Sequence, residues 1–352
     1  MDPLTHALSG ALLARAAATP QPATLPVPRP LPLRWQIAAG FAAAAFPDID
    51  LILRLIDILT YLNWHQGPTH SLIMLPLWAW LLAWLFSKLS RRRYNWRLFY
   101  RSACLGIAIH IAGDLITSYG LMLFAPFTTE RYSLPLVFVI DPWFSLIIVI
   151  GLIASWRYPQ HKIPAIAALL ALCGYVFFLW ALQQHAVSIA HRYISSQTLP
   201  QEQINVLPQP LSPYHWKIII RDHETYHIAD IDLSASSGKP RTGTWLLPSI
   251  IAAYRPAQEN NWHIQQQFGN DPTRSALLRQ AWLAPDFTLF RSFAQFPVLD
   301  SVDTQEPGLC AWFYDLRFKF PELPPSFRYG VCRDNDQADW RTVRQRGLFY
   351  ID

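Results

Sequence analysis

The residues best suited to chemistry in this sequence are histidines and aspartates placed inside apolar stretches. His110 and Asp114 lie four residues apart in one such stretch, so a helix would present both on the same face. Asp48 and Asp50 lie in another. An aspartate at the centre of a membrane helix costs about 2.5–3.5 kcal/mol, so residues of this kind face a polar cavity, pair with one another or bind an ion.

A further pair of histidines lies in a segment that cannot form one continuous helix. In His65-Gln-Gly-Pro-Thr-His70-Ser71, the Gly-Pro step interrupts the helix between the two histidines. We therefore expect His65 on a turn and His70 at the start of the next helix, where Thr69 or Ser71 would act as the cap.

Two Asp-Pro pairs mark the starts of helices. Asp2 and Asp141 each precede a proline, and taken singly each is typical of an N-cap. His6 follows one turn into the first of these segments. A lone histidine in an apolar helix is more often a packing residue. However, four histidines and at least three aspartates in the apolar half together indicate a shared metal site.

Imidazole and carboxylate ligands together suit zinc and related first-row metals, and a catalytic zinc site keeps one position open for water. Bound zinc lowers the pKa of that water to about 7, which provides hydroxide at neutral pH. Two ions about 3.5–4 Å apart would favour phosphoester cleavage. We predict one or two divalent ions, with Zn²⁺ first and Mn²⁺ or Mg²⁺ as alternatives.

Composition divides the chain into two halves. Of its 352 residues, 52% are hydrophobic and 15% are charged, a charged share about ten points below that of a typical soluble protein. The long apolar runs end near Leu182. We predict an α-helical polytopic membrane domain over residues 1–184 and a soluble mixed α+β, β-leaning domain over residues 185–352.

Five to six apolar helices are expected in the first domain, because a membrane span needs about 20 apolar residues. The candidate spans lie near Trp35–Leu59, Ser71–Leu89, Ser102–Leu123, Pro142–Trp156 and Ile163–Leu182, and Pro3–Ala18 would be a short span or a re-entrant helix. In the second domain, we expect strands at Trp216–Ile220, Tyr226–Ile231 and Thr244–Leu247 and a helix around Asp271–Trp282.

Basic residues indicate the orientation of these spans. They cluster in alternate loops, whereas the loops around Tyr61–Thr69 and Ala125–Leu134 contain only Arg131. By the positive-inside rule, the basic loops are cytoplasmic and the second domain lies outside a bacterial inner membrane, in the periplasm. The net charge of +5 therefore reflects the basic residues of the cytoplasmic loops, and we expect no nucleic-acid partner. Cys310 and Cys332 would pair if their domain faces an oxidising compartment.

Five short motifs, in this order, resemble the membrane-bound metal-dependent hydrolases of the LexA-regulated, YdjM-like type. The motifs are Met-Asp-Pro-Leu-Thr-His6, Phe-Pro-Asp48-Ile-Asp50, His65-Gln-Gly-Pro-Thr-His70-Ser71, His110-Ile-Ala-Gly-Asp114 with Thr117-Ser-Tyr-Gly120, and Ile-Asp141-Pro. They lie within roughly residues 1–155. The resemblance implies hydrolysis at the membrane, with His6, Asp48, Asp50, His65, His70, His110 and Asp114 as the matching metal ligands, and Asp141 as a further candidate.

One residue departs from the pattern of that family. Many relatives carry Arg after the first histidine of the third motif, and this chain has Gln66 there. If that Arg binds an anionic group of the substrate, this protein uses another residue or another substrate. The mixed His/Asp ligand set is also similar in kind to that of zinc-dependent phospholipase C and related phosphodiesterases, which is an analogy of site chemistry.

The leading hypothesis is an integral membrane metal-dependent hydrolase, most similar to a phosphoesterase. Metal-bound hydroxide would attack an ester or phosphoester of a lipid or lipid-linked substrate at the outer face, with Asp48 or Asp50 as a ligand or general base. Membrane lipids are the expected partners. One alternative is a transporter or a proton- or metal-coupled carrier that uses the His/Asp cluster as an ion pathway. A second is a metal-stabilised sensor or scaffold without catalysis.

Overall fold

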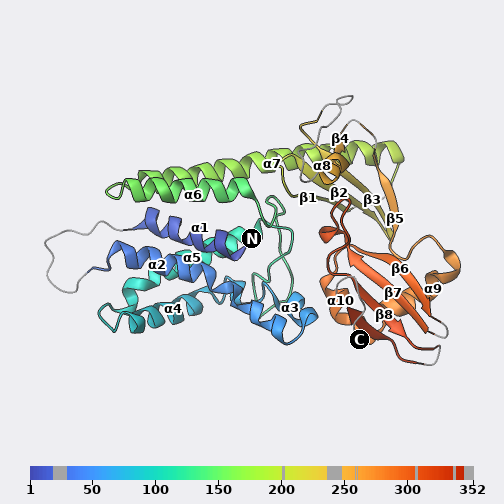
Figure 1. Cartoon of the computed structure of the whole chain (residues 1–352), viewed down its shortest axis with the longest axis horizontal. Helices are drawn as coiled ribbons and strands as arrows, with labels where there is room; N and C mark the ends of the chain where they lie inside the picture. The colour runs from blue at the N-terminus through green and yellow to red at the C-terminus, as the bar shows by residue number, and fades with distance from the viewer. Residues whose placement is uncertain are drawn as a thin grey trace. The chain divides into compact units, whose positions relative to one another are not determined.

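The structure is a computed structural model of the chain. It describes residues 1–18, 30–199, 203–235, 248–257, 259, 261–305, 308–335 and 338–344. The expected strand at Thr244–Leu247 lies outside the described residues. Backbone contacts divide the chain into two units, Met1–Ala181 and Leu182–Asp352. Figure 1 labels the helices and strands of both units.

The first unit is built from helices. They are α1 (Pro3–Ala17), α2 (Leu33–Ala45), η1 (Pro47–Leu55), α3 (Ile58–Trp64), η2 (Pro68–His70), α4 (Leu75–Leu89), α5 (Trp96–Leu115), α6 (Pro142–Arg157) and the first part of α7 (Ile163–Gln197). The N-caps expected from the sequence are confirmed. Asp2 accepts a hydrogen bond from the backbone N–H of Thr5, and Asp141 accepts one from that of Phe144. Each helix therefore begins where a side chain satisfies its first free N–H groups.

Helices α1, α2 and α5 pack closely through glycines (Figure 1). A Cβ atom on Gly40 of α2 would lie 2.6 Å from the carbonyl oxygen of Gly10 in α1. A Cβ atom on Gly106 of α5 would lie equally close, 2.6 Å from the carbonyl oxygen of Gly40. Small residues let helix backbones approach in this way. The three helices that carry or adjoin the predicted metal ligands are therefore held at short range.

A bend follows α2. The axes of α2 and η1 differ by 42°, and η1 begins at Pro47. Proline has no backbone N–H to continue the α-helical ladder, which explains the change of direction. The candidate span Trp35–Leu59 is therefore broken at Pro47, between α2 and η1, and its last two residues belong to α3.

The structure does not confirm five to six spans. Among the described residues, α7 is the single helix long and apolar enough to cross a membrane, and the number rises to three if each of two bent pairs counts as one span. These pairs are α2 with η1, and Ile58–His70 with α4. Helix α6 is apolar but has 16 residues, fewer than the roughly 20 that a span needs.

The second unit has the predicted mixed α/β, strand-rich class. Its first sheet contains β1 (Gln203–Pro208), β2 (His215–Asp222), β3 (Thr225–Asp232), β4 (Arg255–Pro256) and β5 (His263–Gln266). Its second sheet contains β6 (Pro297–Gln305), β7 (Gly308–Asp315), β8 (Tyr329–Arg333) and β9 (Arg341–Arg344). The helices are α8 (Pro248–Ala253), α9 (Pro272–Leu283), η3 (Pro285–Phe287), α10 (Thr288–Phe293) and η4 (Leu316–Phe318). Helix α9 and strands β2 and β3 lie where the sequence predicted a helix and two strands.

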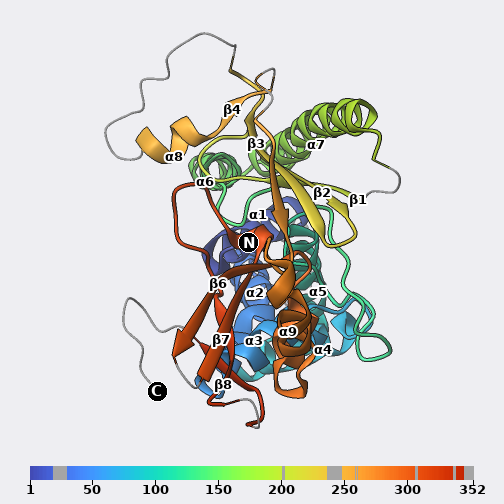
Figure 2. The ribbon, with the colours of Figure 1, turned by 90° about the vertical axis from the view of Figure 1, so that its right-hand side faces the viewer.

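In both sheets of this unit, most strands lie next to their neighbours in the sequence. In the first, β1, β2, β3 and β4 are neighbours in that order, and β5 also pairs with β3. In the second, β6 to β9 follow one another as antiparallel neighbours, and Figure 2 shows β6, β7 and β8 side by side. A buried apolar cluster joins residues from both sheets, namely Leu207, Ile219, Tyr226, Ile228, Phe296, Val298, Tyr314 and Leu316. Hydrophobic burial against the second sheet thus stabilises the first.

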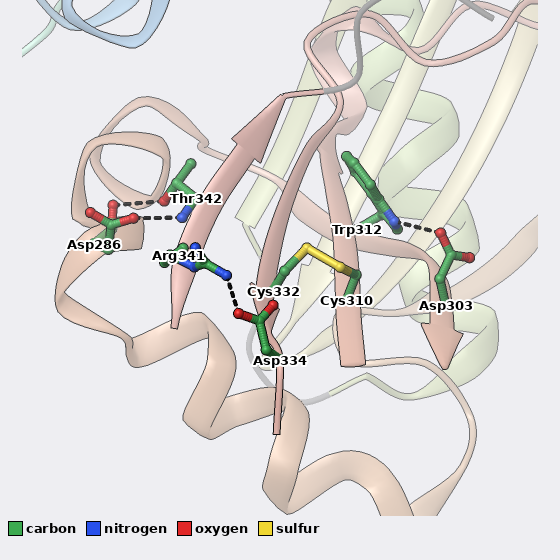
Figure 3. The surroundings of a disulfide bond; sticks show 8 residues. All are labelled: Asp286, Asp303, Cys310, Trp312, Cys332, Asp334, Arg341 and Thr342. Carbon is green, nitrogen blue, oxygen red and sulfur yellow. Dashed lines mark hydrogen bonds and ion pairs between the residues drawn. A yellow bond between two sulfur atoms is a disulfide. The ribbon is translucent and has the colours of Figure 1, made fainter. Parts of the chain in front are cut away.

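A disulfide links neighbouring strands of the second sheet (Figure 3). Cys310 on β7 and Cys332 on β8 are direct register partners, with Cα atoms 4.0 Å apart. The sequence left this pairing open, and the structure forms it. The bond closes a loop between residues 22 apart in the sequence, which restricts the unfolded chain. Nearby, Trp312 Nε1 donates a hydrogen bond to Asp303 Oδ2 across to β6.

Candidate metal centre

Asp48, His70, His110 and Asp114 converge in the interior of the first unit. One potential ligand atom from each residue lies within 4.8 Å of the others. The four side chains come from η1, η2 and α5 and are all buried, with His70 and His110 at 0% exposure. We call this set the four-residue group. Its donors are two imidazole nitrogens and two carboxylate oxygens, a combination suited to zinc and related metals.

Each member of the four-residue group has a buried atom without a hydrogen-bond partner. These atoms are Asp48 Oδ2, His70 Nε2, His110 Nε2 and Asp114 Oδ2. Buried polar atoms are normally paired, and an unpaired one costs about 1–3 kcal/mol. Asp114 Oδ2 lies 3.2 Å from His110 Nε2 and 3.3 Å from His70 Nε2. Asp48 contributes its other oxygen, because Oδ1 lies 3.7 Å from His70 Nε2 and 3.8 Å from His110 Nε2. This arrangement calls for a shared cation. This observation shows that the residues present fit a metal ion.

The tautomer of His110 follows from its neighbour. His110 Nδ1 lies 2.6 Å from the carbonyl oxygen of Ala44, and a carbonyl can only accept a hydrogen bond. The proton is therefore on Nδ1, and Nε2 presents its lone pair to the four-residue group. Ala44 lies in the last turn of α2, where carbonyl groups have no partner within the helix. Helix α2 thereby orients a side chain of α5.

The two oxygens of Asp114 have separate contacts. Oδ1 lies 2.9 Å from His6 Nε2 and is also contacted by the amino group of Met1. Oδ2 lies 3.2 Å from His110 Nε2 and 3.3 Å from His70 Nε2. The His6 ring also stacks on that of His110, with centroids 3.7 Å apart. His6 thus positions Asp114 through a hydrogen bond and His110 through ring stacking. Asp114 Oδ2 remains directed at the Nε2 atoms of His70 and His110.

A second group shares one residue with the first. Asp48, Asp50 and His65 place potential ligand atoms within 4.8 Å of one another. His65 Nδ1 lies 2.9 Å from Asp50 Oδ1, and the backbone N–H of Gln66 donates to Asp50 Oδ2 at 3.1 Å. The His65 side chain is 13% exposed, so this group lies nearer the surface of the unit than the fully buried His70. Asp48 belongs to both groups and can contact an ion in either.

Arg131 fixes the loop that carries His65. Its guanidinium donates to the carbonyl oxygens of His65 at 3.2 Å, Gly120 at 2.7 Å and Asn63 at 2.6 Å. It also lies 5.5 Å from the ring centroid of Tyr119, whose ring packs against His65. Sequence reasoning did not assign Arg131 to the site. Arg131 is the single basic residue in the loops around Tyr61–Thr69 and Ala125–Leu134, and this isolation is the sequence feature that could have identified it.

Helix η1 has two chemically distinct faces. Ile49, Ile52 and Leu55 follow at intervals of three residues and are 58%, 61% and 85% exposed. A 3₁₀-helix has three residues per turn, so these side chains share one face. Asp48 and Asp50 are each only 7% exposed and belong to the metal-binding groups. The same short helix therefore presents carboxylates inward and apolar side chains outward.

The structure brings the seven predicted ligands together in one region. Asp48, His70, His110 and Asp114 form the first group, Asp50 and His65 join Asp48 in the second, and His6 contacts Asp114. Asp141 belongs to neither group. It caps α6 and accepts a hydrogen bond from the hydroxyl of Tyr175.

Backbone groups complete the surroundings of the site. The amino group of Met1 and the carbonyl oxygen of Ala44 contact the site, although sequence analysis named neither. Gln66 contributes its backbone N–H to Asp50, and its buried side-chain Oε1 accepts no hydrogen bond. Its backbone is in the left-handed region, with φ of 60°. The residue at this position thus acts on Asp50 through its main chain.

Comparison with known proteins gives three findings. The chain is 24% identical over 194 residues to the Bacillus subtilis (strain 168) protein named "Uncharacterized protein YfhP", a match that covers 54% of this chain and 57% of that relative. No solved structure shows significant similarity to the chain. The profile of the family described as "YdjM inner membrane protein" matches residues 1–186, which is more than half of the chain and contains both metal-binding groups. The chain therefore belongs to the YdjM inner membrane protein family.

Proposed function

We propose that this protein is an integral membrane hydrolase that binds one or two divalent metal ions, with Zn²⁺ first, and cleaves an ester or phosphoester of a lipid or lipid-linked substrate. The observation that carries the proposal is the four-residue group, in which Asp114 Oδ2 lies 3.2 Å from His110 Nε2 and 3.3 Å from His70 Nε2, and none of these three buried atoms has a hydrogen-bond partner. Membership of an inner membrane protein family supports the membrane location.

The chain's own residues divide the work between the two groups. His70, His110 and Asp114 bind the metal of the buried group, and Asp48 is the ligand that both groups share. When bound, such a metal polarises the scissile group and lowers the pKa of a coordinated water to about 7. Asp50 orients His65 and acts as the general base that accepts the proton of the attacking water.

The surroundings of the second group support a lipid substrate. His65 is the most exposed of the seven candidate ligands, at 13%, and it contacts Asp50 of η1. The same helix exposes apolar side chains, of which Leu55 is 85% exposed. An apolar face on an inner membrane protein suits contact with acyl chains. We propose that acyl chains contact this face and that the polar head group reaches the second group at the partly exposed His65.

The proposal also places the second unit on the periplasmic side of the membrane. The clustering of basic residues in alternate loops supports this orientation through the positive-inside rule. The disulfide between Cys310 and Cys332 adds independent support, because disulfides persist in oxidising compartments such as the periplasm.

The test is hydrolysis by the full-length protein in detergent, loaded with Zn²⁺, against phospholipids, lipid-linked phosphates and ester lipids. We expect turnover of at least one class, and loss of about 10²–10⁴-fold in Asp50→Asn, the range that general acid–base groups contribute. The exposed His185 lies outside both groups, so His185→Ala is the matched control and should retain full activity.

Two results would count against the proposal. The first is wild-type protein that binds metal but cleaves no substrate faster than Asp50→Asn. The second is solute or ion flux across liposomes without hydrolysis, which would favour a carrier that uses the same His and Asp residues.

A further inference from the structure

The second unit contains a polar pocket that the metal chemistry does not use. Its volume is about 250 Å³, slightly below the roughly 300–1,000 Å³ typical of ligand sites. Its lining includes Lys217, Asp230, His263, Gln265, Tyr314 and Lys319. Such a pocket suits a small molecule with polar groups.

Lys217 lies at the inner side of this pocket and is 2% exposed. It is the register partner of Asp230 on the neighbouring strand, with Lys217 Nζ 3.5 Å from Asp230 Oδ1. Nζ also donates a hydrogen bond to the carbonyl oxygen of Lys319. A buried ammonium group requires such partners, so its position is fixed before any ligand enters.

Asp230 has capacity for a further donor. Its Oδ1 is buried and accepts no hydrogen bond, although it lies within ion-pair distance of Lys217. An N–H or ammonium donor from a ligand would satisfy this oxygen, because buried polar atoms are normally paired.

Lys319 brings a second positive charge to the pocket. Burial lowers the pKa of Lys319, and the neighbouring ammonium of Lys217 lowers it further. An anionic group between the two lysines would relieve this repulsion. Glu322 also lines the pocket, and its backbone φ is 59°, in the left-handed region. This conformation costs about 1–3 kcal/mol in a residue other than glycine, and such residues are often found at ligand sites.

We propose that this pocket binds a small zwitterion, with its ammonium group on Asp230 and its oxyanion against Lys217 and Lys319. The lining carries two ammonium groups, Lys217 and Lys319, and two carboxylates, Asp230 and Glu322. A ligand with a single charge would therefore meet groups of its own sign, and a simple anion would leave Asp230 Oδ1 without a hydrogen-bond donor. A molecule with both charges satisfies both ends. The shared chemistry is an ammonium group and an oxyanion in one small molecule, as in an amino acid or an aminoalkyl phosphate head group.

The test is isothermal titration calorimetry of the full-length protein in detergent. The probes are glycine, L-serine and O-phosphoethanolamine, with acetate and ethylamine as single-charge halves. We expect at least one zwitterion to bind, and both halves to bind at least about tenfold more weakly, because each lacks one charge-assisted hydrogen bond. Stronger binding of O-phosphoethanolamine than of the amino acids would identify a phosphate head group as the source, and the reverse order would identify amino acids.

Asp230→Asn and Lys319→Gln should each weaken binding of the preferred zwitterion about tenfold or more. Glu224→Gln changes an exposed carboxylate that pairs with Arg279 outside this pocket, so it should bind like the wild type. If circular dichroism shows that Asp230→Asn does not fold, the result for Lys319→Gln decides whether the pocket binds the zwitterion, because Lys319 is partly exposed and less important for folding. Absence of binding by all three zwitterions, equal binding of the halves, or unchanged binding in the folded variants would overturn the proposal.

Discussion

His110 Nε2 lies 3.2 Å from Asp114 Oδ2, one helical turn away on α5, yet the two atoms form no hydrogen bond. The proton of His110 is on Nδ1, where the carbonyl oxygen of Ala44 accepts it. In an imidazole whose single proton is on Nδ1, Nε2 and Oδ2 present lone pairs to each other. A cation between them converts this repulsive contact into two favourable ones.

The first prediction concerns metal removal. A chelator should lower the thermal unfolding temperature of the wild-type protein, because a ligand at about one hundred times its dissociation constant stabilises the folded state by about 2.7 kcal/mol. His110→Ala removes one donor, so the chelator should produce little further change in that variant. Differential scanning fluorimetry in detergent measures both effects. The exposed His185→Ala control should respond like the wild type, and a chelator-insensitive wild type would contradict the prediction.

The second prediction concerns the number of ions. If Asp48 serves both groups, the wild-type protein should bind two metal ions per chain. His65→Ala removes a ligand of the more exposed group alone and should leave about one ion, whereas His70→Ala should remove the buried ion. Inductively coupled plasma mass spectrometry of the purified variants gives the ratio. One ion in both the wild type and His65→Ala would exclude a second ion at the more exposed group.

The third prediction concerns the packing around His6. A Cβ atom on Gly113 would lie 3.2 Å from Cε1 of the His6 ring, so Gly113→Ala should displace His6 from Asp114 and weaken metal binding. Gly174 in α7 is a matched control, because a Cβ atom there meets nothing within 4 Å. Competition with a zinc indicator dye measures the affinity. Equal affinities for Gly113→Ala and Gly174→Ala would show that His6 does not orient the ligand.

The fourth prediction concerns the cysteines. In protein purified from membranes and denatured without reductant, a maleimide should label Cys104 and Cys173, which are free. Cys310 and Cys332 should react only after reduction. Peptide mass spectrometry identifies the labelled residues. Complete labelling of all four without reductant would place the second unit in a reducing compartment and contradict the proposed orientation.

The fifth prediction concerns pH. Burial alone would raise the pKa of Asp232, but hydrogen bonds from His215 and Ser234 outweigh it and hold this pKa well below its ordinary value. A carboxyl whose pKa is lowered by folding stabilises the protein above its unfolded pKa of about 3.9 and loses that contribution as the pH falls further. Asp232→Asn should therefore lower the unfolding temperature at pH 7, and the difference should shrink below about pH 4.

Thermal unfolding of the full-length protein, followed by tryptophan fluorescence at both pH values, checks this dependence. Asp334→Asn is the control, because Asp334 forms an exposed ion pair with Arg341, and such pairs contribute about 0–1 kcal/mol. A difference between Asp232→Asn and the wild type that is the same at both pH values would contradict the assignment.

Local sequence patterns predicted those parts of the site that depend on one element. The spacing of His110 and Asp114 placed both on one face of a helix, as α5 has them. The Gly-Pro step separated His65, the C-cap of α3, from His70 in η2. The expected helix around Asp271–Trp282 is α9, because its Asp-Pro start and its length are local features.

Features that depend on tertiary packing could not be predicted in this way. His6 reaches Asp114 because α1, α2 and α5 approach through Gly10, Gly40 and Gly106. The contact of the Ala44 carbonyl with His110 involves a backbone group, so the type of residue at position 44 does not predict it. Five to six spans are also not confirmed, because among the described residues one helix is long and apolar enough to cross a membrane, or up to three spans if each bent pair counts as one.

In the proposed membrane setting, the exposed apolar face of η1 contacts lipid, and the nine residues of this helix would link the candidate metal site to the bilayer. A slip of one residue in a 3₁₀-helix rotates its faces by about 120°, which would expose a carboxylate to hydrocarbon and turn an isoleucine inward. The bilayer penalises that rotation, so it acts as an external support for Asp48 and Asp50. Activity in this protein should therefore vary with the acyl-chain length of the host membrane, and detergent micelles should support it less well than bilayers of native thickness.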